Sequence, residues 1–190
     1  HPIIHSDTGP GPSYTEVFTP RPDPAVAPKL EPRAQLLRLS LDLRGVRPSP
    51  EEYAALAADP EGGLATLREA FLADPRFAAR ARDLYANVTF TRVEDFPVSA
   101  GDLGIDPDDG PRLYASIGEE PLMMLARIVL EDRPLTELVT ADWTMADDLL
   151  ADVFPVRQEG GEHAVGDGWR VARYTDGRPA AGWLSTNALW

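Results

Sequence analysis

Three histidines are the residues of this chain best suited to hold a redox metal. His1 would offer its α-amine and its imidazole to one ion, and His5 or His163 could supply a second imidazole. Amine and imidazole nitrogens suit copper, and three of them would form a T-shaped copper site. Such a site needs rigid support, and the proline-rich sequence around His1 argues against it. The alternative interpretation is that His1 has no role as a ligand.

Acidic residues in a glycine-punctuated stretch form a second candidate metal site. Asp102, Asp106 and Asp108 lie between Gly101 and Gly110, and their oxygens could bind Ca²⁺. The spacing differs from the EF-hand pattern, which needs acids at alternate positions and a glycine at the sixth. The alternative interpretation is an acidic turn that is exposed to water.

The other reactive groups do not form a complete catalytic arrangement in the sequence. Acidic pairs such as Glu119–Glu120 are adjacent, and adjacent residues on a helix do not share a face. The Met123–Met124 pair is predicted to pack in the core. The chain has no cysteine, which excludes disulfides, thiolate metal sites and covalent haem within it. Copper and calcium are therefore the candidate cofactors, and whether the chain is an enzyme stays open.

The charge balance indicates which partners the chain can attract. Lys and Arg number 18 against 31 Asp and Glu, so the net charge is −13. This balance disfavours nucleic acids and anionic membrane surfaces and favours a basic protein partner. No apolar run approaches the roughly 18 to 20 residues of a membrane span.

The first 32 residues are predicted to form an extended arm. They contain eight of the 19 prolines of the chain, and proline is incompatible with helix interiors and central strands. Tyr14 and Phe18 are apolar enough to lie along the surface of a partner. A stiff, proline-rich chain loses little entropy when it docks. The alternative interpretation is a disordered leader.

Helices are predicted from residue 33 to residue 155. Ser49 and Asp74 each precede a proline and are typical N-terminal caps of helices, while Gly45 ends the helix before them. A further helix is expected from about Glu119 to Glu131.

Residues 156–190 are predicted to form a small β-hairpin and a docking segment. Residues 169–174 alternate with the period of a strand, Asp176–Gly177 is typical of a tight turn, and residues 181–186 would return as the partner strand. Trp183 and Trp190 would anchor this segment on a partner. The expected fold is mainly α: an irregular helical domain (33–155) with an extended Pro-rich N-terminal arm (1–32) and a small C-terminal β-hairpin.

Several short motifs occur in a fixed order along the chain. The first is Leu-Asp-Leu-Arg-Gly-Val-Arg-Pro-Ser-Pro-Glu-Glu, and it is followed by Leu-Ala-Asp-Pro-Arg-Phe, at residues 41–52 and 72–77. The next are Arg-Pro-Leu-Thr-Glu-Leu-Val-Thr-Ala-Asp-Trp-Thr and Ala-Gly-Trp-Leu-Ser-Thr, at residues 133–144 and 181–186. Together they resemble the front part of the cytochrome-associated domains of unknown function first noted in planctomycetes.

This resemblance implies a secreted or cell-surface bacterial protein that works near electron-transfer chemistry. Members of the family usually continue into a region with Cys-x-x-Cys-His, which would carry haem. This chain has no cysteine, so it resembles only the part without haem. The resemblance supplies no catalytic residues.

The expected function is therefore a structural or interaction module of a larger extracytoplasmic bacterial assembly, located in the periplasm, at the cell surface or outside the cell. Its partners would be other protein subunits or the continuation of its own chain. The alternative is a copper-binding redox protein that uses His1. A third hypothesis is a hydrolase or carbohydrate-active domain that stacks sugars on its tryptophans.

Overall fold

The computed structural model describes residues 29–160 and 168–189. The chain divides into two units, residues 1–31 and residues 32–190, and the elements below belong to the second. The fold is mainly helical with a small antiparallel sheet near the C-terminus, which confirms the predicted fold class.

Four helices form the first half of the folded unit. They are α1 (Pro32–Arg44), α2 (Pro50–Ala58), α3 (Gly63–Leu72) and α4 (Pro75–Thr89). The predicted breaks between them are confirmed. Gly45 has a φ of 72°, which an L side chain rarely adopts, and Ser49 forms a complete capping box with Glu52 at the start of α2. Leu36, Leu56 and Phe71 close a small core between α1, α2 and α3.

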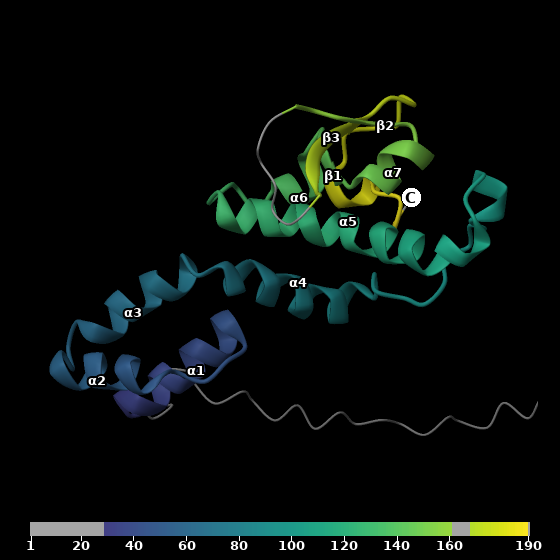
Figure 1. Ribbon diagram of the computed structural model, residues 1–190. Coiled ribbons are helices and arrows are strands. Elements are labelled where there is room, and N and C mark those ends of the chain that lie inside the picture. Colours follow the sequence, from purple (N-terminus) through teal and green to yellow (C-terminus); the bar gives the residue numbers. More distant parts are fainter. Residues whose placement is uncertain (1–28, 161–167, 190) are drawn as a thin grey trace, which may run out of the picture. The chain divides into compact units, whose positions relative to one another are not determined.

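Helix α5 (Gly110–Leu130) is the central element of the second half. It packs against α4 on one side and against the sheet on the other (Figure 1). It begins well before the predicted start at Glu119, because the apolar stripe already includes the buried Leu113 and Ile117. Pro111 occupies the first turn of α5, where a backbone N–H would have no partner within the helix, so the N–H that proline lacks is not needed. Pro121 lies inside the helix. Met123 and Met124 are buried, as predicted.

Two short 3₁₀ turns connect α4 with α5. They are η1 (Gly101–Leu103) and η2 (Pro107–Asp109), and the rest of residues 90–106 is irregular.

The sheet has three strands, β1 (Thr144–Ala146), β2 (Val156–Gln158) and β3 (Arg170–Tyr174), in the order β1-β3-β2. Both partners of β3 are antiparallel to it, and Thr144 lies opposite Ala172 while Val156 lies opposite Tyr174. The short helices α6 (Glu137–Thr140) and α7 (Asp148–Val153) flank β1 in the sequence.

The predicted pairing of residues 169–174 with residues 181–186 is wrong. Both edges of β3 are already hydrogen-bonded to β1 and β2, so no edge is left for a third partner. Residues 182–185 instead form a 3₁₀ helix, η3 (Gly182–Ser185), which packs on α6. Gly182 has a φ of 54°, and a β-carbon on it would lie 2.3 Å from the carbonyl oxygen of Leu138.

None of the helices in the described ranges 29–160 and 168–189 is long and apolar enough to cross a membrane.

Candidate functional site

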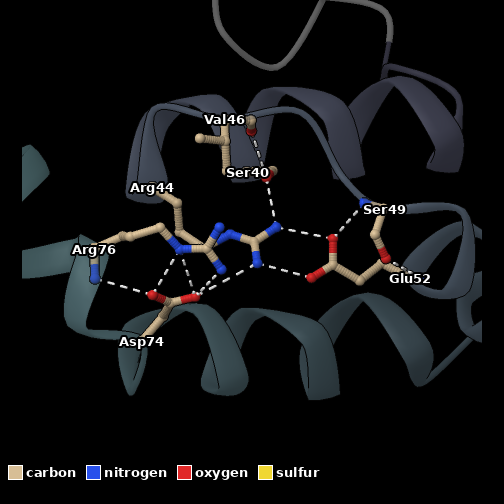
Figure 2. A network of polar contacts seen from close by, with 7 residues as sticks. All are labelled: Ser40, Arg44, Val46, Ser49, Glu52, Asp74 and Arg76. Carbon is tan, nitrogen blue, oxygen red and sulfur yellow. Dashed lines mark hydrogen bonds and ion pairs between the residues drawn. The ribbon is translucent and has the colours of Figure 1, made fainter.

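Arg44, at the C-terminus of α1, organises a polar network that joins α1, α2 and the start of α4 (Figure 2). Its guanidinium donates two hydrogen bonds to the Glu52 carboxylate, at 2.7 and 2.9 Å. It also lies 3.6 Å from Asp74 and 3.5 Å from the centre of the Phe71 ring. The side chain is only 4% exposed, and its two terminal nitrogens are paired with acids, while its buried Nε has no hydrogen-bond partner among the described residues.

The carboxylates of this network cap the helices that follow. Glu52 accepts a hydrogen bond from the Ser49 amide, and Asp74 accepts one from the Arg76 amide at the start of α4. The hydrogen bonds from the Arg76 side chain are the largest cause that lowers the pKa of Asp74 to about 2. Five of these residues, Arg44, Ser49, Glu52, Asp74 and Arg76, fall within the first two sequence motifs. Those motifs therefore encode helix junctions and leave no group directed at a ligand.

The last two motifs meet each other around Trp143. Glu137 accepts hydrogen bonds from the Trp143 indole at 3.2 Å and from the Arg133 guanidinium at 2.9 Å. The backbone amide of Gly182 donates to the carbonyl of Ala141 at 3.0 Å. These motifs likewise build internal contacts between α6, β1 and η3.

Glu120 is the most unusual titratable group in the described part of the chain. It lies in the middle of α5 and is 1% exposed. Its carboxylate is contacted by four donors: the hydroxyls of Thr144 and Tyr174, and the backbone and side-chain amides of Asn187. Burial raises the pKa of Glu120, while the hydrogen bonds act in the opposite direction.

Because Glu120 is enclosed by protein groups, its role is to hold the segment after η3 against α5. Asn187 also accepts a hydrogen bond from Arg178 at 3.3 Å, and Arg178 in turn donates to Asp176 and stacks on the Tyr174 ring. Arg178 also lines two pockets, of about 260 and 210 Å³. The charge of Arg178 is matched by Asp176, so neither pocket offers an excess positive charge to an anion.

Several large apolar side chains are exposed around the end of α4, and we call this region the α4-end surface. It consists of residues whose side chains face water although they are large and apolar: Leu84 (44% exposed), Val88 (73%), Phe90 (78%) and Val93 (40%). Leu84 and Val88 are four residues apart and share one face of the helix.

The backbone around Phe90 places its ring in water. Phe90 caps the C-terminus of α4 with a φ of 54°, the left-handed conformation that usually requires glycine. Thr91, the next residue, is buried against α5, where Gly118 has no side chain. The chain therefore turns sharply at Phe90 so that Thr91 can pack inward, and the ring is left outside.

A groove runs beside this surface. It has a volume of about 550 Å³ and is lined by residues from the α4–α5 connection and from α5, namely Arg92, Val93, Glu94, Pro111, Ala115 and Glu119. A smaller pocket of about 290 Å³ next to it includes Phe90 and shares Arg92. Arg92 lines both the groove and the smaller pocket. Its ion pairs with Glu119 and Asp83 hold its side chain in place.

The structure places the predicted metal ligands as follows. His1, His5 and His163 lie outside the described residues. Within residues 29–160 and 168–189, no three His, Asp or Glu side chains form a group that could hold a metal ion. Asp106 instead caps η2 by accepting from the Asp108 amide at 3.0 Å. Asp102, Asp106 and Asp108 are therefore not brought together as a group of ligands in the described part of the chain.

The predicted interface residues have different outcomes. Tyr14, Phe18 and Trp190 lie outside the described residues. Trp183 is only 9% exposed and packs edge-on against Tyr85 of α4, with the ring centres 5.7 Å apart. Trp183 is thus a core residue, and an external docking role for its side chain does not fit the structure.

Two features of this site were missed from the sequence. In the sequence Glu120 stands out only as half of an adjacent acidic pair, although its spacing from Leu113, Ile117 and Met124 puts it on the buried face of α5. The exposure of Phe90 depends on where α4 ends, and no glycine marks that position in the sequence.

No protein-family model matches this sequence, no curated protein is similar to it, and no solved structure is similar to it.

Proposed function

We propose that this chain is an interaction module that binds another protein through the α4-end surface, as part of a larger extracytoplasmic bacterial assembly. The observation that carries this proposal is Phe90, a large aromatic residue that is 78% exposed in a left-handed backbone conformation. Strained conformations of this kind tend to occur at functional sites.

The energetics of Phe90 support a role outside the folded chain. The left-handed conformation costs a residue with a β-carbon roughly 1–2 kcal/mol. The exposed ring recovers little of this cost by packing within the unit. Burial of such a side chain in a partner would contribute about 1.5–3 kcal/mol, which offsets the strain. Exposed aromatic side chains are also typical anchors of protein interfaces.

Other large apolar side chains are exposed near this anchor in the sequence. Leu84 and Val88 share one face of α4, Phe90 lies in a pocket with Ala86 and Asn87, and Val93 lines the groove. The groove volume of about 550 Å³ lies within the 300–1,000 Å³ typical of ligand-binding clefts. Two parts of the proposal, the location outside the cytoplasm and the association with electron-transfer proteins, have a separate basis. They rest on the resemblance to cytochrome-associated domains, which is carried by the motifs at residues 41–52, 72–77, 133–144 and 181–186.

The test compares two variants of the full chain by affinity capture from the source cells with quantitative mass spectrometry. Val88→Ser/Phe90→Asn removes the anchor while asparagine tolerates the left-handed backbone. Leu135→Ser is the matched control, because Leu135 is also exposed (56%) but lies next to α6.

We expect at least one protein to be captured by the wild-type chain and the control and lost, by tenfold or more, from the double variant. Thermal unfolding should show that the double variant is folded. Identical sets of captured proteins for all three chains would contradict the proposal.

A further inference from the structure

The α4–α5 connection has a strongly one-sided charge. Residues 93–111 contain six acidic residues and no lysine or arginine, and all six are exposed: Glu94, Asp95, Asp102, Asp106, Asp108 and Asp109. Across the longer range 82–119, eight acids face three arginines, which leaves a formal charge of −5.

Two of these arginines already have acidic partners. Arg92 pairs with Asp83 at 2.7 Å and also with Glu119, while Arg82 pairs with the other oxygen of Glu119 at 3.1 Å. The third, Arg112, lies in the first turn of α5. The acids of residues 93–111 therefore dominate the electrostatic potential at this end of the protein.

This acidic segment adjoins the apolar groove. Val93, Pro111 and Ala115 provide the apolar part of its lining, and Glu94 provides an exposed carboxylate at the same site, whereas Glu119 is already paired with arginines. An apolar hollow with acidic neighbours is complementary to a side chain that is apolar itself and has cationic neighbours. Burial of the anchor would supply affinity, and the charges would steer the encounter.

We infer that the partner docks with a basic segment, in which an aromatic or aliphatic anchor enters the groove beside Arg92 and flanking Arg or Lys side chains face the acids of residues 93–111. This inference rests on the proposed function and specifies the chemistry of the partner. A second copy of this chain is a poor occupant, because it carries the same net charge of −13 and the same acidic segment. Nucleic acids are repelled for the same reason.

The test uses random 12-residue peptides displayed on phage, selected on the full chain and counter-selected on Phe90→Asn. Enriched peptides are then synthesised, and their affinities are measured by fluorescence anisotropy at low and high salt. Glu94→Gln/Asp109→Asn removes two charges near the groove. Its matched control is Glu61→Gln/Asp152→Asn, which removes two exposed charges from the α2–α3 turn and from α7.

We expect enriched peptides to place Arg or Lys next to Trp, Phe or Leu. Phe90→Asn should weaken the affinity of these peptides tenfold or more. Glu94→Gln/Asp109→Asn should weaken it about three- to tenfold, and the control less than twofold. Affinity should fall as salt rises, because exposed charges are screened.

The other outcomes separate the two proposals. Peptides that depend on Phe90 but show no excess of basic residues would overturn the basic partner and leave the docking surface in place. Equal weakening by both charge variants would show that attraction to the whole acidic protein is enough, which also overturns the inference. Enrichment of peptides that does not depend on Phe90 would contradict the proposal that the α4-end surface binds a partner.

Discussion

Gly118 of α5 and Thr91 lie so close together that a β-carbon on Gly118 would stand 2.2 Å from the Thr91 carbonyl oxygen. This contact turns the chain inward directly after Phe90. The exposure of the Phe90 ring is therefore linked to the absence of a side chain at Gly118.

The first prediction concerns this contact. Gly118→Ala should lower the free energy of unfolding by about 1–3 kcal/mol, because the opposing atom belongs to the backbone and cannot rotate away. The gain of up to about 1 kcal/mol that alanine brings to a helix interior is too small to compensate. Urea unfolding measures the change, and Gly160→Ala is the control, because a β-carbon there meets nothing within 4 Å. A Gly118→Ala protein as stable as the wild type would show that residues 90–92 pack differently.

The second prediction concerns Phe90 itself. Phe90→Gly should raise the free energy of unfolding by about 0.5–1 kcal/mol, because glycine relieves the left-handed strain and the lost ring is mostly in water. The greater freedom of glycine in the unfolded chain limits this gain. Val88→Ser, at a residue 73% exposed, should change stability by less than about 0.5 kcal/mol. A clear loss of stability in Phe90→Gly would mean that the ring contributes to the fold.

The third prediction tests the polar network of Figure 2. Arg44→Met should destabilise the protein by about 3–5 kcal/mol, because Glu52 and Asp74 would lose their buried cationic partner. Arg68→Met is the control: Arg68 pairs with Glu69 at 2.8 Å, but both side chains are more than half exposed. Such surface pairs contribute about 0–1 kcal/mol. Equal effects of the two substitutions in urea unfolding would contradict the structural role of Arg44.

The fourth prediction uses the raised pKa of Glu120. A native pKa above the ordinary value of 4.5 means that the folded protein holds this proton longer than the unfolded chain does. Glu120 therefore lowers the stability as the pH rises from about 4.5 through its native pKa.

Glu120→Gln should remove this slope, because glutamine resembles the protonated acid. Its oxygen can accept from the Asn187 amides, and its amide can donate to the hydroxyls of Thr144 or Tyr174. The difference between variant and wild type, measured by urea unfolding from pH 4 to pH 8, should grow in favour of the variant as the pH rises. The exposed control Glu61→Gln should follow the wild type. A constant difference across this range would contradict the titration of Glu120.

The helix junctions could be predicted from the sequence because their signals are local. Ser49 with Glu52 and Asp74 with Pro75 act within three residues of each other, so spacing alone identifies the caps. The sheet could not be predicted in the same way. Thr144 pairs with Ala172 across nearly thirty residues, and the length and composition of β1 do not distinguish it from a loop.

The candidate site depends on contacts between distant segments, which the local pattern does not contain. The residue type and position of Trp183 predict an interface, but its burial follows from the packing of η3 against α4 and α6. The role of Gly118 likewise follows only from the position of Thr91 on the neighbouring segment. Residue types thus indicated an interaction module, and the packing decided which apolar side chains remain outside.

The contacts of Glu120 have a consequence for folding during synthesis on the ribosome. All the groups that surround its carboxylate follow it in the chain, at Thr144, Tyr174 and Asn187. While the ribosome is still making these segments, Glu120 in the nascent α5 is hydrated, and its burial among apolar residues would cost free energy without these partners. Helices α1 to α3 can close their own core early, because they are contiguous in sequence. We therefore expect α5 to pack fully only after residue 187 has left the exit tunnel.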